Sequence, residues 1–136
     1  MLIRLFVRLH TFIYRLTGGR LGGSWAMADV LLLTTVGRRS GRSRTTPLLY
    51  LPDGDAFVVV ATNDGSPDHP QWYRNLQAHP HATVHVRSRK VRVVAEDAAG
   101  ADRERLWPLL VAIYPNYERD QQRTDRELPV VMLRPR

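Results

Sequence analysis

The sequence contains no cysteine among its 136 residues. Disulfide bonds, thiolate metal sites and a cysteine nucleophile are therefore excluded. Long hydrophobic runs are absent too, because no window approaches the roughly 18–20 uninterrupted apolar residues of a membrane-spanning helix. The sequence also has no Gly-x-Ser-x-Gly nucleophile elbow and no Walker A loop. These gaps exclude the commonest motifs of hydrolases and nucleoside triphosphatases.

Lysine is almost missing, because Lys90 is the single lysine among 20 basic residues and all the others are arginines. The net charge of +7 favours an acidic partner, such as nucleic acid, anionic lipid or a phosphorylated ligand. A nucleic-acid surface would interleave basic residues with aromatic ones. The arginines are instead dispersed, apart from a cluster at Arg38–Arg44. We therefore expect no nucleic-acid partner.

The chain is long enough for one domain with a substantial hydrophobic core. No internal repeat and no linker divides it. We predict an N-terminal amphipathic helix over residues 1–17 and a single domain over residues 24–136. The absence of cysteine fits a cytoplasmic protein.

The predicted N-terminal helix rests on apolar residues that recur three or four positions apart. Arginines at positions 4, 8 and 15 interrupt any signal-peptide core, and a run of glycines after residue 17 ends the helix. The apolar positions are Leu2, Leu5, Phe6, Leu9, Phe12, Ile13 and Leu16.

The rest of the chain alternates short apolar or β-branched runs with strong turn signals. Many short strands joined by tight turns favour a mainly β (α+β) fold, an antiparallel barrel with peripheral helices, over a doubly wound parallel sheet. The predicted strands are residues 30–36, 45–51, 56–61, 82–86, 90–95 and 129–133, and the predicted helices are residues 70–77 and 101–114, the second interrupted by Pro108.

The segment Gly37–Arg44 combines two glycines, four arginines and two serines. Glycine lets the backbone turn sharply, and the arginines and hydroxyls donate hydrogen bonds to an anion. The segment is a candidate cradle for a phosphate or a polycarboxylate. A solvated basic hairpin is the alternative, and composition alone leaves both open.

Two aromatic groups are further candidates. Trp72 and Tyr73 stand on the short predicted helix, where they can line a planar ligand, although aromatic residues at helical spacing more often belong to the core. Tyr114 and Tyr117 flank a turn, so both phenols can donate to a carbonyl oxygen that gains negative charge. A pair of half-buried structural tyrosines is the commoner arrangement.

The histidines do not predict a metal site. His81 and His85 share strand parity, so they point the same way about 13 Å apart, which is too far for one metal ion. No acidic residue stands beside them. We expect no metal.

Three segments together resemble the deazaflavin (coenzyme F420)-dependent nitroreductase family, whose members include quinone reductase-like oxidoreductases. The segments are residues 31–51 (LLLTTVGRRSGRSRTTPLLYL), 58–76 (VVVATNDGSPDHPQWYRNL) and 107–129 (WPLLVAIYPNYERDQQRTDRELP). The first has the family's order of a strand, Gly-Arg-basic-Ser-Gly-x-x-Arg and a strand that opens with proline. The resemblance runs from about Tyr14 to the end of the chain, and it implies a split β-barrel that binds the deazaflavin in a groove.

The resemblance also implies roles for single residues. Arg39 and Arg44 match the basic positions that hold the coenzyme's phosphate and glutamyl tail, in agreement with the cradle interpretation. Tyr114 and Tyr117 match tyrosines that face the substrate, and with Thr62 they are the candidate catalytic residues. The candidate cofactor-binding residues are Arg39, Ser40, Gly41, Arg44, Pro47, Ala61, Thr62, Asn63, Trp72 and Asn75.

The reaction implied by the resemblance is hydride transfer from reduced coenzyme F420 to a quinone-like or nitroaromatic acceptor. Deazaflavin is an obligate two-electron donor, so the protein's task is to orient it. Thr62, Asn63 and Asp120 depart from the family member whose quinone and nitroimidazole chemistry defines the group, which has serine, lysine and a third tyrosine there. The resemblance therefore covers the coenzyme side more fully than the acceptor side.

Two other functions stay open at this point. One is a split-barrel oxidoreductase that binds flavin mononucleotide (FMN). The other is a non-catalytic protein that binds deazaflavin or a membrane surface. The N-terminal helix bears on the second, because arginines flank its apolar stripe over residues 2–16 and suit a helix lying on anionic lipid. Packing of that stripe on the barrel or across the groove is the alternative.

We predict that the intact protein, cytoplasmic and peripheral on the inner face of the plasma membrane, associates reversibly with anionic vesicles. High salt should weaken the association and deletion of residues 1–17 should abolish it, because each basic residue near the surface contributes only about 1 kcal/mol. Co-sedimentation of the intact and truncated proteins with vesicles measures it. Intact protein that stays in the supernatant at low salt would show that the helix is only part of the fold.

Overall fold

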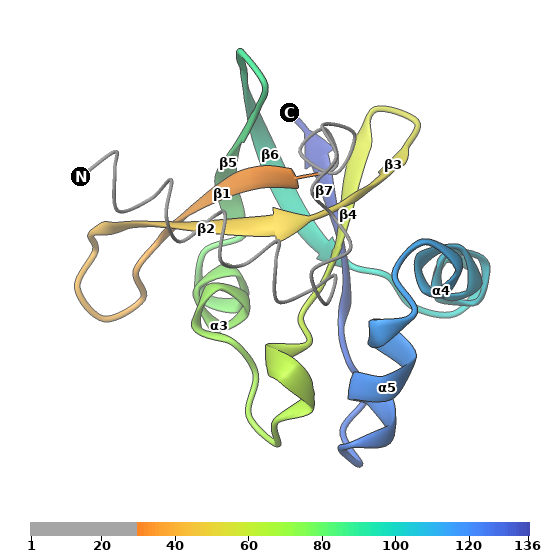
Figure 1. Ribbon diagram of the computed structural model, residues 1–136. Coiled ribbons are helices and arrows are strands. Elements are labelled where there is room, and N and C mark those ends of the chain that lie inside the picture. Colours follow the sequence, from red (N-terminus) through yellow and green to blue (C-terminus); the bar gives the residue numbers. More distant parts are fainter. Residues whose placement is uncertain (1–29) are drawn as a thin grey trace.

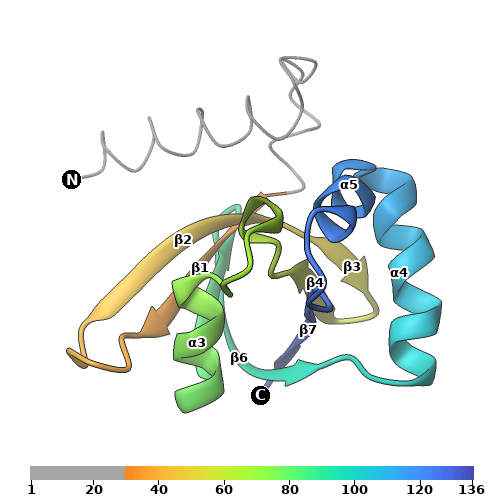
Figure 2. The same cartoon turned by 90° about the horizontal axis from the view of Figure 1, so that it is seen from below.

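The computed structural model describes residues 30–136, so the predicted helix over residues 1–17 lies outside the described residues. Seven strands form one antiparallel sheet in the order β2-β1-β5-β6-β7-β4-β3, which curls around α3 (Figures 1 and 2). The elements are β1 (Val30–Val36), β2 (Ser43–Leu49), β3 (Leu51–Asp53), β4 (Ala56–Val60), the 3-10 helix η1 (Asn63–Gly65), α3 (Gln71–Ala78), β5 (His81–Val86), β6 (Arg89–Asp97), α4 (Ala101–Ile113), α5 (Asn116–Gln122) and β7 (Val130–Pro135).

Strand β4 explains why the core has two parts. All five of its residues are buried, because both of its faces are covered. Val58 and Val60 pack with Leu106 and Leu110 of α4 on one face. Phe57 and Val59 pack on the other face in the cluster that includes Trp72 of α3. The continuous apolar run in the sequence is therefore a strand between two layers.

Strands β1 and β2 form a long ribbon that carries the basic segment. They pair without interruption from Val30 opposite Leu49 to Val36 opposite Ser43. The residues between the two strands therefore project from the end of a regular ladder (Figure 1). Strands β2 and β3 lie at the two edges of the sheet. Strand β2 contains Pro47, and strand β3 contains Pro52. An edge strand tolerates proline because one of its sides needs no hydrogen-bond donor.

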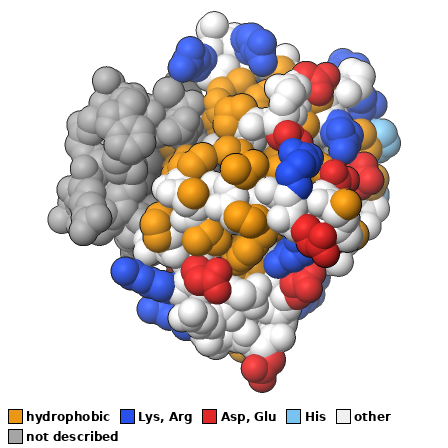
Figure 3. Space-filling model, turned by 90° about the vertical axis from the view of Figure 1, so that its right-hand side faces the viewer, with side chains coloured by type: hydrophobic (Ala, Val, Ile, Leu, Met, Phe, Trp, Pro, Cys, Tyr) orange, Lys and Arg blue, Asp and Glu red, His pale blue; other side chains and the backbone are white. Residues whose placement is uncertain are grey.

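Helix α4 covers one side of the sheet but is not fully amphipathic. Leu106 and Leu110 are buried, whereas Leu109 and Ile113 are 48% and 46% exposed. Figure 3 faces this side and shows hydrophobic side chains gathered between charged ones. Within residues 30–136, no helix is long and apolar enough to cross a membrane.

The antiparallel, mainly β architecture with peripheral helices confirms the sequence prediction. Two details of the prediction are wrong. Residues 45–51 are not one strand, because the chain bends at Tyr50 and passes from its pairing with β1 to a pairing with β4. Helix α4 continues through Pro108, because that proline and Glu104 lie on the exposed side, where water can satisfy the freed carbonyl.

The short helix α5 was not predicted from the sequence. It packs against η1, and Gly65 marks the closest approach. A Cβ atom at Gly65 would lie 2.7 Å from the Asp120 carbonyl oxygen and 2.9 Å from the Arg123 Cβ atom. Gly65 also has a φ of +75°, which favours glycine. The contact between η1 and α5 therefore requires glycine at this position.

We predict that Gly65→Ala lowers the free energy of unfolding by more than about 1 kcal/mol, because it adds a steric clash to an unfavourable φ. Gly54→Ala is the matched control, since Gly54 has a φ of +61° but no atom within 4 Å of the added Cβ. Urea denaturation of both variants measures the difference. Equal losses of stability would show that backbone strain alone matters and that η1 and α5 can separate freely.

Candidate functional site

The loop between β1 and β2 is a tight, internally bonded turn. The Gly37 amide donates to the Arg42 carbonyl, and the Gly41 amide donates to the Gly37 carbonyl, both at 2.8 Å. The Arg42 amide donates to the Ser40 hydroxyl at 3.1 Å. Gly41 has a φ of +73°, and a Cβ atom at Gly37 would lie 2.9 Å from the Ser40 hydroxyl oxygen. Both glycines are therefore required by the shape of this loop.

Asn75 of α3 anchors this loop to the rest of the protein. Its side-chain oxygen accepts hydrogen bonds from the Arg38 backbone amide at 3.2 Å and from the Arg38 guanidinium at 2.9 Å. Its side-chain nitrogen donates to the Thr35 hydroxyl at 3.2 Å. The same guanidinium donates to Gln71 at 2.7 Å. Asn75 is only 4% exposed, so the structure places this predicted cofactor ligand beneath the loop.

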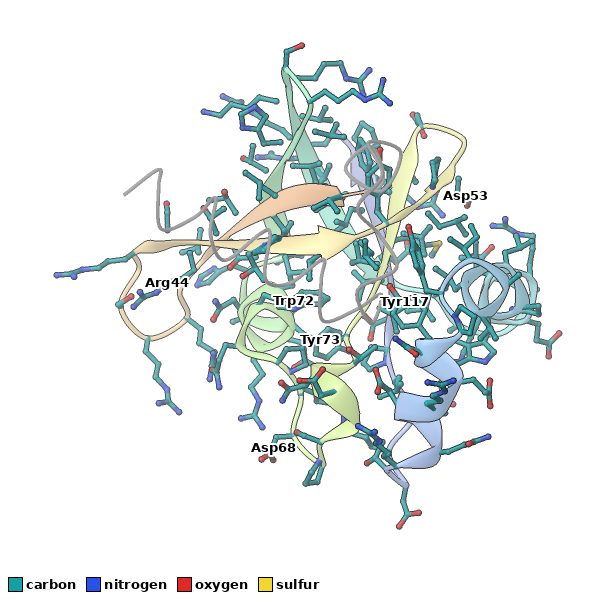
Figure 4. All side chains as sticks on the ribbon, viewed as in Figure 1. Arg44, Asp53, Asp68, Trp72, Tyr73 and Tyr117 are labelled. Carbon is teal, nitrogen blue, oxygen red and sulfur yellow. The ribbon has the colours of Figure 1, made fainter. Side chains whose placement is uncertain are left out.

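The other three arginines of the predicted cradle point outward, two from the loop and Arg44 from the start of β2. Arg39, Arg42 and Arg44 are exposed, as are Ser40 and Gly41. No ion pair within residues 30–136 includes any of the three. Figure 4 shows Arg44 where the loop enters β2. We call these three residues the arginine rim. The rim places three cations on the fixed β1–β2 loop and the start of β2.

Pro47 lies further along β2, opposite Leu32 of β1, and is partly buried. Trp72 is buried in the core cluster beneath the sheet and meets Tyr73 edge to face at 6.3 Å. The structure thus gives Trp72 the packing role that is usual for aromatic residues at helical spacing. Figure 4 labels Trp72 at α3.

The segment after β4 contains three predicted site residues, Ala61, Thr62 and Asn63. Ala61 is buried, and Thr62 is partly buried. Asn63 has a φ of +46°, and its side-chain nitrogen donates to the Ser66 hydroxyl at 3.1 Å and to the Asp68 carbonyl at 2.9 Å. The Asn63 side chain therefore closes its own loop.

Arg126, which is distant in sequence, holds this segment by direct hydrogen bonds. Its Nε donates to the Ser66 carbonyl at 2.8 Å, and its Nη2 donates to the Thr62 carbonyl at 2.8 Å. Its Nη1 reaches the Ala61 carbonyl at 3.4 Å and the His69 Nδ1 atom at 3.0 Å. Sequence reasoning missed Arg126, because its partners are backbone carbonyls about 60 positions away.

His69 is a neutral acceptor in this arrangement. Burial lowers the pKa of the imidazole, and the positive charges of Arg126 and Arg74 lower it further. Its ring packs against the Tyr73 ring at a tilt of 51°, with the centroids 4.8 Å apart. Because the guanidinium can only donate, the His69 Nδ1 atom that faces it accepts.

The two candidate tyrosines lie together, as their spacing predicted. The rings of Tyr114 and Tyr117 meet edge to face with centroids 5.5 Å apart. Both belong to the core cluster beneath α4, and Tyr117 is 5% exposed. Burial raises the pKa of the Tyr117 hydroxyl far above its ordinary value, and the neighbouring Tyr114 and Asp120 raise it further. Tyr117 therefore keeps its proton and can act as a hydrogen-bond donor.

Asp120 of α5 is a partly buried carboxylate near the two tyrosines. Burial raises the pKa of its carboxyl group, and the charge of Asp64 raises it further. Its backbone carbonyl lies at the close contact with Gly65. The segment before α3 and helix α5 therefore adjoin each other, and Figures 1 and 2 show η1 between α3 and α5.

A cavity of about 380 Å³ is lined by Tyr73 and by residues of α3 and β6. Its lining includes Leu76 and Pro80 at the end of α3 and Ala95 of β6. At its wall the Tyr73 hydroxyl donates to Asp97 at 2.5 Å. None of the residues predicted to hold the coenzyme lines it. Within the described part of the chain, no three side chains of histidine, aspartate or glutamate gather as metal ligands.

The arrangement has the parts needed to hold an anionic, planar cofactor. The arginine rim offers guanidinium donors for phosphate or carboxylate groups. The backbone of residues 61–63 is fixed by Arg126 and can border a ring. The two tyrosines supply phenol groups on the α5 side. The structure brings η1 and α5 together and ties the loop to α3.

Comparison with known proteins agrees with this arrangement. The model of the family described as F420H(2)-dependent quinone reductase matches residues 6–135. The chain is 40% identical over 131 residues to an F420H(2)-dependent quinone reductase of Mycobacterium tuberculosis, covering 93% of this chain and 88% of that protein.

Solved structures give the same result. The structure of an F420-H2 dependent reductase superposes with a TM-score of 0.71 at 35% identity, covering 77% of this chain and 93% of that one. A haem storage protein from Vibrio cholerae, only 15% identical with a TM-score of 0.56, shares the fold alone over 80% of this chain and 82% of its own. The fold is the split β-barrel, and the chain belongs to the F420H(2)-dependent quinone reductase family.

Proposed function

We propose that this protein is an oxidoreductase that uses reduced coenzyme F420 to reduce a quinone. The observation that carries the proposal is the arginine rim, three exposed arginines on and beside a loop that Asn75 holds in place, none of which has a carboxylate partner within residues 30–136. Such a rim suits a coenzyme with a phosphate and an acidic tail. The family match and the F420H(2)-dependent relative support the same cofactor and acceptor.

The residues present fit this coenzyme. Arg39 and Arg44 would hold the phosphate and the acidic tail, with Arg42 beside them, and the segment Ala61–Asn63 would border the ring. When bound, reduced coenzyme F420 supplies the hydride. FMN is the alternative cofactor, but it has one phosphate and no glutamyl tail, so it would use fewer of the rim's cations.

The acceptor side is assigned to Tyr114 and Tyr117. Each phenol can donate a hydrogen bond to an acceptor oxygen that gains negative charge, and burial strengthens such a bond because little water competes with it. The raised pKa of Tyr117 makes it a donor that does not ionise at neutral pH. Thr62 can donate a further hydrogen bond through its hydroxyl group. Reduction of a nitroaromatic acceptor belongs to the same proposal.

We also propose that the protein is cytoplasmic and meets the inner face of the plasma membrane through residues 2–16. The support is the apolar stripe of that segment with its flanking arginines. A lipid-soluble quinone would then be within reach of the site.

We predict that Arg39→Ala and Arg44→Ala each weaken the binding of coenzyme F420 by about 10- to 100-fold. A hydrogen bond to a charged group contributes about 1.5–3 kcal/mol, which corresponds to that range. Fluorescence titration of the purified proteins measures the affinity. Arg89→Ala, which removes an exposed arginine at the β5–β6 turn, is the control and should bind normally. Wild-type affinity in both rim variants, or equal affinity for FMN, would exclude this assignment of the rim.

We predict that Tyr114→Phe and Tyr117→Phe lower the turnover of a menadione-like quinone and leave coenzyme affinity nearly unchanged. Loss of one donor to a developing oxyanion costs up to roughly 10²–10³ in rate. Steady-state kinetics at saturating coenzyme measures the effect. Tyr50→Phe, at the corner between β2 and β3, is the control. Turnover at the wild-type rate in both Tyr114→Phe and Tyr117→Phe would make these residues purely structural.

A further inference from the structure

The segment after β4 contains three consecutive residues with left-handed backbone conformations. Asn63, Asp64 and Gly65 follow one another with φ values of +46°, +57° and +75°. A residue other than glycine in this region costs on the order of 1 kcal/mol and persists only when its surroundings impose it. Hydrogen bonds of the Asn63 side chain hold part of this loop from within, and the carbonyls before and after the left-handed residues are constrained from outside it.

Arg126 supplies that constraint. Its guanidinium donates to the carbonyls of Thr62 and Ser66 on either side of the left-handed residues, and it reaches the Ala61 carbonyl. A guanidinium has its donors in one rigid plane, so the carbonyls that it binds are held in fixed relative directions. No ion pair within residues 30–136 involves Arg126, so these donors are directed to the backbone and to His69.

The direction of these carbonyls decides the direction of the neighbouring amides. In a trans peptide group the C=O and the following N–H point to opposite sides. Because Arg126 draws the Ala61 and Thr62 carbonyls toward itself, the N–H groups of Thr62 and Asn63 point away from it. Thr62 is right-handed and Asn63 left-handed, a succession that turns consecutive N–H groups toward one side.

We propose that Arg126 is a positioning residue for the coenzyme, which aims the Thr62 and Asn63 amides at the ring by holding the carbonyls of residues 61, 62 and 66. The assignment rests on the proposed function, because it takes residues 61–63 as the border of the deazaflavin ring. Arg126 acts through the backbone and touches neither coenzyme nor acceptor. Ring oxygen and nitrogen atoms are the acceptors that such amides would recognise.

A matched control exists in Arg103. It too donates to a backbone carbonyl of the C-terminal segment, that of Leu128 at 2.7 Å. It packs over the Trp107 ring at 5.1 Å, and it pairs with Glu127 at 3.3 Å. It has no hydrogen bond to residues 61–66. Removal of Arg103 therefore costs packing and hydrogen bonds of a similar kind without releasing the loop.

The first experiment uses the intact protein without coenzyme. Hydrogen exchange of the Gly65 and Ser66 amides reports on the loop, because they donate to the Thr62 and Asn63 carbonyls at 2.9 and 3.0 Å. In Arg126→Gln these amides should exchange about tenfold faster or more relative to wild type, as expected when a charged hydrogen bond is lost. In Arg103→Gln their exchange should stay at the wild-type rate. Unchanged exchange in Arg126→Gln would overturn the proposal.

The second experiment is fluorescence titration with coenzyme F420 together with steady-state kinetics. Arg126→Gln should raise Kd and the KM for the coenzyme about tenfold or more, with a smaller change in kcat at saturation. Arg126→Lys keeps the charge without the planar fork, and it should show the same defect if direction matters. Faster loop exchange with wild-type coenzyme affinity would overturn the positioning role. If Arg126→Gln does not fold, Arg126→Lys decides the matter by the same two measurements.

Failure of the proposed function gives a different result. If the wild-type protein itself does not bind coenzyme F420, the proposed function and the positioning role fall together, whatever the exchange data show. If wild-type protein binds and Arg126→Lys binds equally well, only the positioning role falls.

Discussion

The buried side chain of Asn75 connects three parts of the candidate site. It accepts from Arg38, donates to Thr35 and belongs to α3, so helix, strand and basic loop meet at one amide. Loss of a partner would leave a buried polar group unsatisfied, at a cost of about 1–3 kcal/mol. Because one arginine is used for this anchor, the arginine rim projects from a loop with one preferred shape. The position of the charged rim therefore depends on the neutral side chain of Asn75.

Two sets of arginines in the structure have different physical roles. Arg103, Arg105 and Arg126 are matched by carboxylates or backbone carbonyls, and their charge is satisfied within the protein. Within residues 30–136, no carboxylate pairs with the rim arginines. A net charge of +7 says little about where the unbalanced charge lies. An acidic ligand at the β1–β2 loop would meet the exposed guanidinium groups of the rim.

Much of the fold and part of the candidate site could be predicted from the sequence, whereas helix α5 and the contacts of Arg126 could not. The bounds of β1 follow from its continuous apolar run, and the closeness of Tyr114 and Tyr117 follows from their spacing. Helix α5 was missed because only Tyr117 among its residues is buried, so it has no apolar stripe. Arg126 acts between segments far apart in the chain. Sequence periodicity describes an element and its faces, whereas such contacts depend on how distant segments meet.

The prolines of the two outer strands have a consequence for the molecule in concentrated solution. The outer strands of a sheet have peptide groups without a partner strand, and these groups can pair with a strand of another molecule. Pro47 and Pro52 lack a backbone N–H group, so each outer strand of the sheet over residues 30–136 has one hydrogen-bond donor fewer. Fibril-like stacking would therefore meet an obstacle on both sides.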